Sequence, residues 1–171
     1  MAITISAVTP PDVHAIAALA RIVWQEVYPA IISQAQIDTM LGQRYNAPRL
    51  LEELAAPGIW WDQIHVNGTL AGFASTLLTD TRGEMKLDKL YIDPAQQRLG
   101  LGGRLIAQVS GRALAEGCDT LILAVNKQNS RAIAAYLKNG FAVREAVRVE
   151  SGNGFVMDDF IMAKSLVPSA D

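Results

Sequence analysis

The sequence has few residues that form covalent or metal crosslinks. It holds a single cysteine, Cys118, so no disulfide can form within the chain. Its two histidines, His14 and His65, stand apart and lack the spacing of metal ligands. These absences predict a protein without a structural metal that works in a reducing compartment, which we take to be the cytoplasm.

An excess of positive charge and long apolar runs are also missing. The 15 Lys and Arg residues against 17 Asp and Glu give a formal net charge of −2 and a pI near 5.7, so nucleic acid is not an expected partner. No run approaches the ~20 apolar residues that span a bilayer. The N-terminus also lacks the basic flank and apolar core of a signal peptide. We therefore expect no membrane association.

What the chain does contain is typical of one packed α/β domain. Its 171 residues and 50% hydrophobic content suit a single domain, 1–171, with a flexible tail at 168–171. Apolar periodicity and turn residues predict strands at 3–8, 59–66, 69–79, 84–92, 120–125, 141–150 and 155–164. They predict helices at about 12–28, after Ser33, and at 47–55, 101–116 and 130–138. This order predicts a mixed sheet with helices on both faces.

Two of these segments carry sharper local expectations. The Asn67-Gly68 pair between two apolar runs is the strongest short signal for a β-hairpin. The helix that begins near residue 101 is expected to bury an apolar stripe of Leu105, Ile106, Val109 and Leu114.

The most informative segment is residues 87–104, LDKLYIDPAQQRLGLGGR, in which a strand leads through Asp93-Pro94 into a glycine-rich turn and a helix. Glycines in such a turn leave the backbone N–H groups accessible, and the helix N-terminus adds partial positive charge, so the turn suits a phosphate. A Walker A loop is excluded because no Gly-Lys-Ser/Thr occurs. A dinucleotide fingerprint is excluded because Leu105 stands where its last glycine is required.

The spacing Gln97-x-x-Gly100-x-Gly102 resembles the acyl-CoA pyrophosphate loop of the GNAT superfamily of N-acetyltransferases. A second segment, residues 121–141, resembles the later part of the same core: a strand, an Asn, an Ala-rich helix, a Tyr, then Gly-Phe. Two matches in the right order about 30 residues apart are much harder to obtain by chance than one. The matching positions of the second segment are Asn129, Ala132, Tyr136, Gly140 and Phe141.

The resemblance extends over nearly the whole chain and implies a fold and an activity. The implied fold is a mixed, mostly antiparallel sheet flanked by helices, with the fourth and fifth strands splayed like a V around the pantetheine arm. The implied reaction is transfer of an acetyl group from acetyl-CoA to a primary amine, by direct attack in a ternary complex, with a small amine expected as acceptor. A protein N-terminal acetyltransferase and a catalytically silent acyl-CoA-binding sensor stay open as alternatives.

The resemblance also implies the residues that bind the cosubstrate. The strand end would offer backbone groups to the pantetheine arm and an N–H to the thioester carbonyl. The glycine-rich turn would wrap the pyrophosphate, with two arginines supplying charge, and an Asn that caps the next helix would also touch the cofactor. The implied cofactor-binding residues are Leu90, Tyr91, Ile92, Gln97, Arg98, Leu99, Gly100, Leu101, Gly102, Gly103, Arg104, Asn129 and Tyr136.

Tyr136 is the candidate general acid, because two helical turns return it to the face of Asn129 and a phenol can protonate the leaving thiolate. The base is open. Asp88 is the leading carboxylate, and a water chain is as good a choice. The end of the first long helix, Glu26 and Tyr28, and the pair Asp158-Asp159 are further options. Cys118 follows a helix end, where nothing lowers its pKa, so an acyl-enzyme is not expected.

The acceptor itself is not encoded in a motif. We expect the segment 24–40 and the loop 151–154 to shape its site. Acidic residues there would attract a cationic amine such as a polyamine, but a solvated face explains them equally well. A homodimer through terminal strands or helices is a further expectation, because the adjacent Trp60 and Trp61 point to opposite faces of a strand. The acidic residues are Glu26, Asp38, Glu150 and Asp158.

Overall fold

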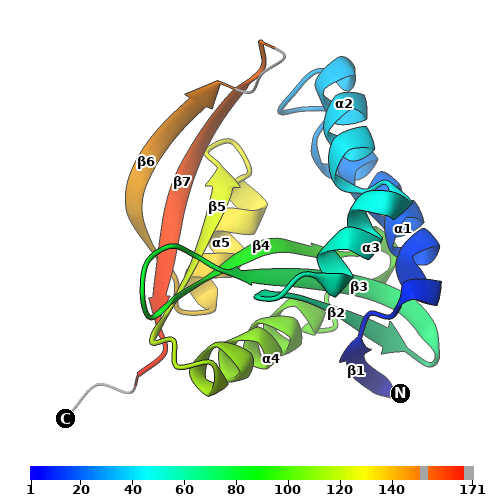
Figure 1. Ribbon diagram of the computed structural model, residues 1–171. Coiled ribbons are helices and arrows are strands. Elements are labelled where there is room, and N and C mark those ends of the chain that lie inside the picture. The colour runs from blue at the N-terminus through cyan, green and yellow to red at the C-terminus, as the bar shows by residue number, and fades with distance from the viewer. Residues whose placement is uncertain (151–153, 168–171) are drawn as a thin grey trace. The chain divides into compact units, whose positions relative to one another are not determined.

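A computed structural model describes residues 1–150 and 154–167 of the chain. Within these residues seven strands form one sheet in the order β1-β2-β3-β4-β5-β7-β6 (Figure 1). The predicted flexible tail at 168–171 and most of the predicted acceptor loop at 151–154 lie outside the described residues. The strands are β1 (Ile3–Ala7), β2 (Ile59–Val66), β3 (Thr69–Leu78), β4 (Glu84–Ile92), β5 (Thr120–Asn126), β6 (Ala142–Glu150) and β7 (Val156–Ser165). The helices are α1 (Val13–Val27), α2 (Gln34–Arg44), α3 (Ala47–Ala55), α4 (Leu101–Ala115) and α5 (Ser130–Lys138), with short 3-10 turns η1 (Pro10–Asp12) and η2 (Pro94–Gln96).

The sheet is mixed and mostly antiparallel. The pairs β1–β2, β2–β3, β5–β7 and β6–β7 are antiparallel, whereas β4 and β5 are parallel. The parallel register joins only Glu84–Lys86 to Thr120–Ile122, at the first residues of each strand, and both strands continue beyond it. The V-shaped splay of these two strands stays a prediction.

The chain forms two compact units. Unit 1 comprises Met1–Leu77 and Lys89–Leu105, and unit 2 comprises Leu78–Asp88 and Ile106–Asp171. The organisation of 1–171 as a single domain stays a prediction.

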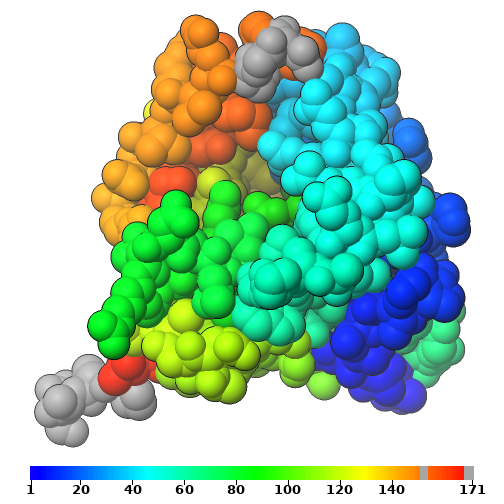
Figure 2. All heavy atoms as spheres, viewed as in Figure 1, coloured from blue at the N-terminus to red at the C-terminus, as the bar shows by residue number. Residues whose placement is uncertain are grey.

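Helix starts in unit 1 are set by local side chains. Ser33 accepts a hydrogen bond from the backbone of Gln36 at the start of α2, as predicted, and Asn46 caps α3 in the same way. The Asp12 carboxylate accepts the backbone N–H and the hydroxyl of Thr9 at 2.8 and 2.7 Å. These bonds hold the pKa of Asp12 below its usual range. The helices α2 and α3 follow one another and contact each other, and both lie on the face of unit 1 that Figure 2 shows.

The predicted hairpin between β2 and β3 is confirmed. Asn67 has φ 51° and Gly68 has φ 81°, the positive values that a type I′ turn requires at both central residues. This conformation suits an Asn-Gly pair because glycine has no Cβ to clash and Asn tolerates the left-handed region. The turn places β2 against β3 in register from Val66 and Thr69 onward, with one irregularity at Ile64/His65.

In unit 2 the predicted stripe of α4 is right except at its last position. Ile106, Val109 and Ala113 are buried, but Leu114 is 50% exposed. The prediction of Leu114 was wrong because the inward stripe continues four residues after Val109, at position 113, and the next residue is turned about 100° away. Ala113 is small, so apolar volume alone did not identify it.

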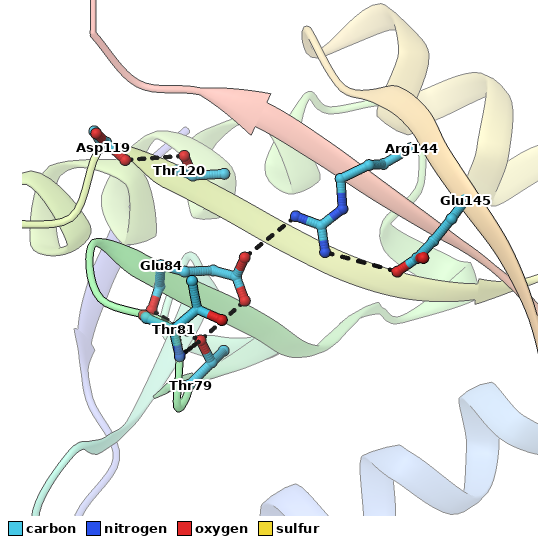
Figure 3. Close-up of polar contacts among 7 residues, drawn as sticks. All are labelled: Thr79, Thr81, Glu84, Asp119, Thr120, Arg144 and Glu145. Carbon is cyan, nitrogen blue, oxygen red and sulfur yellow. Dashed lines mark hydrogen bonds and ion pairs between the residues drawn. The ribbon is translucent and has the colours of Figure 1, made fainter.

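Polar contacts fix the start of β4 within unit 2 (Figure 3). Glu84 accepts a hydrogen bond from the Thr79 hydroxyl at 2.9 Å, and its other carboxylate oxygen lies 3.2 Å from Arg144. Arg144 also lies 3.9 Å from Glu145 on the same strand, β6. Thr120, the residue that pairs with Glu84 in the β4–β5 register, donates to Asp119 at 2.9 Å. The charged groups therefore secure the strand where the parallel ladder begins.

Candidate active site

The end of β4 approaches β3 unusually closely within unit 1. A Cβ atom on Gly72 of β3 would lie 2.7 Å from the carbonyl oxygen of Tyr91 and 2.6 Å from Ile92 Cδ1. The N–H of Asp93 donates to the carbonyl of Ala71 at 2.8 Å. Only glycine permits this approach, because any side chain at position 72 would collide with the backbone. The segment 90–92, which the sequence assigns to the cosubstrate, is thus held in a defined backbone position and is half-buried.

The segment that follows, residues 97–103, is called the glycine turn here. Gln97 donates its side-chain amide to the carbonyl of Ile92 at 3.3 Å. Arg98 has φ 70° and Gly100 has φ 72°. A left-handed non-glycine residue costs about 1 to 3 kcal/mol and often marks a functional site. Left-handed residues that alternate with ordinary ones make backbone N–H groups converge into an anion-binding concavity.

The glycine turn leads directly into α4. Its residue Leu101 is buried, whereas Gly100 and Gly102 adjoin space that no protein atom fills. Leu101 is only 2% exposed and holds the helix start in the core. The first helical hydrogen bond runs from Arg104 N–H to the Gly100 carbonyl at 3.2 Å, so the preceding N–H groups have no partner within the helix. A Cβ on Gly100 or Gly102 would meet no atom within 4 Å. The open space and these donors fit a pyrophosphate, and Arg98 and Arg104 are both exposed nearby in the chain.

The second predicted segment lies on α5 in unit 2. Asn129 caps the helix as predicted, accepting a hydrogen bond from Ala132 N–H at 3.3 Å. The positions that share its face, Ala132, Ile133 and Tyr136, are half-buried, whereas most of the remaining helix is exposed. The Tyr136 ring contacts Phe141 edge-on with centroids 5.6 Å apart, and its carbonyl accepts the Phe141 N–H at 3.0 Å. The Tyr and Gly-Phe positions of the motif therefore pack together.

The carboxylates differ in how tightly they are held. Asp158 lies 2.8 Å from the Lys127 ammonium, and this hydrogen bond lowers the pKa of Asp158. A base needs a pKa near the working pH, so this pairing makes Asp158 a poor one. Asp88 is half-buried and lies 3.7 Å from Lys86. Glu26 is exposed on α1.

Cys118 is buried, and that burial raises the pKa of its thiol, with Glu116 and Asp119 adding to the effect. The thiol is therefore held in its protonated, poorly nucleophilic form. Within residues 1–150 and 154–167, no group of three or more His, Cys, Asp or Glu side chains could hold a metal. In the same part of the chain, no helix is both long and apolar enough to cross a membrane.

Sequence reasoning did not identify an aromatic cluster in unit 1. Two of its rings contact Lys89, which is 7% exposed: the Lys89 ammonium lies 5.2 Å from the Trp61 ring centroid and 5.9 Å from that of Tyr45. Its rings come from α1, β2, β3, β4 and the residues after α1 and α2, so no local motif could have revealed it. A lysine on the buried side of β4, between Leu87 and Tyr91, was the only available signal. The rings are Trp24, Tyr28, Tyr45, Trp61, Phe73 and Tyr91.

The predicted site residues thus fall into two sets. The strand end, the glycine turn and Arg104 belong to unit 1, where they are consecutive in the chain and adjoin one another. Asn129 and Tyr136 belong to unit 2, together with Asp88.

Comparison with known proteins identifies the class. The model of the acetyltransferase (GNAT) family matches residues 16–141, so the chain belongs to this family of N-acetyltransferases, whose cosubstrate is acetyl-CoA. The predicted family, fold class and cosubstrate are confirmed. The matched range includes the glycine turn, α5 and the aromatic cluster.

Two likenesses extend over almost the full length. The spermidine N(1)-acetyltransferase of Thermoplasma acidophilum is 25% identical over 162 residues, which cover 92% of this chain and 97% of that protein. The structure of the PaiA N-acetyltransferase of the same organism, in complex with coenzyme A, has a TM-score of 0.83 and 25% identity, and covers 96% of this chain and 99% of that one. A shorter match, 37% identical over 79 residues, is to the ribosomal protein bS18-alanine N-acetyltransferase of Escherichia coli; it covers 46% of this chain and 52% of that protein.

Proposed function

We propose that this chain transfers the acetyl group of acetyl-CoA to the primary amine of a small molecule, by direct attack of the amine in a ternary complex. The observation that carries the proposal is the open glycine turn at the start of α4, where a Cβ on Gly100 or Gly102 would meet nothing. Such a turn suits a pyrophosphate better than it suits packing, because a purely structural turn would place protein atoms against these positions.

On the cosubstrate side, the N-terminal N–H groups of α4 bind the pyrophosphate, and Arg98 and Arg104 add charge. The backbone of Leu90, Tyr91 and Ile92 binds the pantetheine arm and gives one N–H to the thioester oxygen. The close contact at Gly72 supports this role, because it holds the strand end in one position. A preorganised donor stabilises developing charge without reorganisation during the reaction.

Acetyl-CoA supplies an activated acyl carbon and a thiolate leaving group. Tyr136 donates a proton to the departing sulfur, since a phenol of pKa ~10 can serve a thiol of pKa ~8.5 when it is hydrogen-bonded in place. The recipient of the amine proton is open between a water chain and a carboxylate, for which Asp88 is the candidate. Asp88 is half-buried on β4, and Asp158 is the poorer choice because its hydrogen bond to Lys127 lowers its pKa.

Direct attack, without an acyl-enzyme, is supported by the state of the only cysteine. Cys118 is 5% exposed and its thiol pKa is raised. A thiol that is both inaccessible and protonated does not attack a thioester. The amine is then the nucleophile in the acyl transfer itself. The cytoplasm, where acetyl-CoA and amines are both present, is the compartment that we propose.

The small-amine acceptor is supported by the likeness to a spermidine acetyltransferase over nearly the full length of both chains. Glu26 and Asp38 are exposed on α1 and α2, in the segment that the sequence assigns to the acceptor, and their charge suits a cationic amine. A second candidate, acetylation of a protein N-terminus, is favoured by the higher identity of the shorter match to an alanine N-acetyltransferase.

The test is a panel of acceptors assayed for release of the CoA thiol. It should contain a polyamine, an alkyl monoamine, an amino sugar and a peptide with an N-terminal alanine. Turnover with a small amine, at least tenfold above that with the peptide in kcat/KM, is the expected result. Preference for the peptide would establish the second candidate, and no thiol release with any member of the panel would refute the proposal.

A further inference from the structure

Two of the six rings of the aromatic cluster of unit 1 belong to residues that are only half-buried. Four of its six rings are buried: Trp24, Tyr45, Trp61 and Phe73 are each 3% exposed or less. The other two, Tyr28 and Tyr91, are half-buried. Their hydroxyl oxygens lie 3.1 Å apart, within hydrogen-bond distance, and either can be the donor. The two half-buried members of the cluster are therefore joined through their hydroxyl groups, and this contact is itself part-buried.

Both members of this pair are held firmly by the backbone around them. Tyr28 directly follows α1: its N–H donates to the Trp24 carbonyl at 3.0 Å, and its own carbonyl accepts two N–H groups of the following turn at 2.9 Å. Its ring packs on Trp24 with centroids 4.4 Å apart. Tyr91 lies on β4, where Gly72 permits the closest approach of β3. A geometry fixed this well is what a catalytic or binding constellation needs.

The two hydroxyl groups also lie in suitable places along the chain. Tyr91 is in the segment 90–92, whose backbone is proposed to hold the thioester. Tyr28 is itself half-buried and is followed by the exposed residues Pro29 and Ala30. A hydrogen-bonded pair of hydroxyls that runs from a reaction site to solvent can move a proton without forming a charged side chain, because each oxygen gives up one proton as it accepts another.

We propose that the Tyr28–Tyr91 hydroxyl pair carries the proton of the acceptor amine to water. As the nitrogen–carbon bond forms and the carbon–sulfur bond breaks, one amine proton passes to the Tyr91 oxygen. The Tyr91 proton passes to the Tyr28 oxygen, and the Tyr28 proton passes to water. The thiolate takes its proton from Tyr136, as already proposed, and Tyr136 afterwards recovers a proton from water, so that no net proton is gained or lost. This inference rests on the proposed function and gives the amine proton a route through two phenols in place of the carboxylate of Asp88.

The alternative is that the hydroxyl bond only ties α1 to β4. Replacing either tyrosine by phenylalanine keeps the rings and removes one hydroxyl, so the two roles separate. The variants are Tyr28→Phe, Tyr91→Phe and the double variant. The matched control is Tyr45→Phe, which removes a hydroxyl from a buried ring of the same cluster. Measured quantities are kcat on the best amine of the panel, acetyl-CoA affinity by calorimetry, and Tm.

A relay predicts that kcat falls about 10- to 100-fold in Tyr91→Phe, while acetyl-CoA affinity and Tm stay near those of the wild type. Tyr28→Phe should lose a similar factor, and the double variant should be no worse than the poorer single variant, because the pair acts as one unit. Tyr45→Phe should keep its kcat.

Two outcomes would overturn the relay. In one, the phenylalanine variants keep the wild-type kcat and lose only Tm, which assigns the pair a structural role. In the other, Asp88→Asn abolishes turnover while both phenylalanine variants retain it, which assigns the proton to the carboxylate. Both outcomes leave the acetyltransferase proposal standing. If the wild-type protein releases no CoA thiol with any amine of the panel, the proposed function is refuted, and the relay is refuted with it.

Discussion

Gly102 offers the sharpest test of the proposed pyrophosphate site, because a side chain there should block a ligand without disturbing the fold. Its φ lies outside the left-handed region, and a Cβ would meet no protein atom within 4 Å. Gly102→Val therefore introduces no backbone strain, and its Cβ meets open space. In a helix, valine and glycine differ by only a few tenths of a kcal/mol, so the free energy of unfolding should change little.

Binding should respond very differently. The valine methyl groups would occupy the space through which the pyrophosphate reaches the N–H groups of α4. Losing one or two charge-assisted hydrogen bonds costs about 2 kcal/mol, which corresponds to a roughly 30-fold weaker Kd. Calorimetry with acetyl-CoA measures this directly, and thermal unfolding measures the fold.

The same helix supplies the matched control. Gly111 also lies in α4, and a Cβ on it would likewise meet nothing within 4 Å. Gly111→Val makes the same chemical change more than two helical turns further along, away from the N-terminal N–H groups. It should leave acetyl-CoA affinity unchanged. Equal affinity in the wild type and both variants would refute the assignment of the pyrophosphate to this turn.

Four other contacts make predictions of their own. Tyr136→Phe keeps the ring contact with Phe141 but removes the proposed acid, so kcat should fall roughly 10²-fold while acetyl-CoA affinity and Tm stay unchanged. A near-normal kcat, under conditions where chemistry limits the rate, would refute the catalytic role of Tyr136. The pKa of Asp12 is lowered in the folded state, so the contribution of its carboxylate to stability is present above the unfolded pKa of about 3.8 and is lost as the pH falls through the lower folded pKa. Asp12→Asn should therefore lower Tm at neutral pH and have less effect in acid. An equal difference in Tm at both pH values would contradict this. Gly72→Ala should cost about 1 to 3 kcal/mol of unfolding free energy, because its Cβ meets a carbonyl oxygen at 2.7 Å. Gly42→Ala, in open space on α2, should be neutral or stabilising. Denaturant unfolding compares the two variants, and equal stabilities would show that β3 adjusts freely. The homodimer expected from Trp60 predicts a mass of about twice 18.5 kDa by light scattering at micromolar concentration, and a species of 18.5 kDa alone would exclude it.

The elements were predictable because their boundaries are written in neighbouring residues. Ser33 and the Asn67-Gly68 pair act through atoms within three positions of themselves, so their effect does not depend on the rest of the fold. The glycine turn was predictable for the same reason. Its left-handed residue at Arg98 was not, since an arginine carries no intrinsic preference for positive φ and is held there by its surroundings.

The pairing of Tyr28 with Tyr91 escaped prediction because this contact joins distant parts of the chain. Tyr28 and Tyr91 are 63 residues apart, and each alone is an ordinary amphipathic aromatic at the end of an element. Their significance arises only when α1 and β4 pack together. Backbone recognition of a phosphate needs a short glycine pattern that recurs wherever the ligand recurs, whereas recognition of an amine uses side chains that several elements supply. The sequence therefore reveals the cosubstrate more readily than the acceptor, and the hydroxyl pair is where mutagenesis can add most to what the glycine turn already indicates.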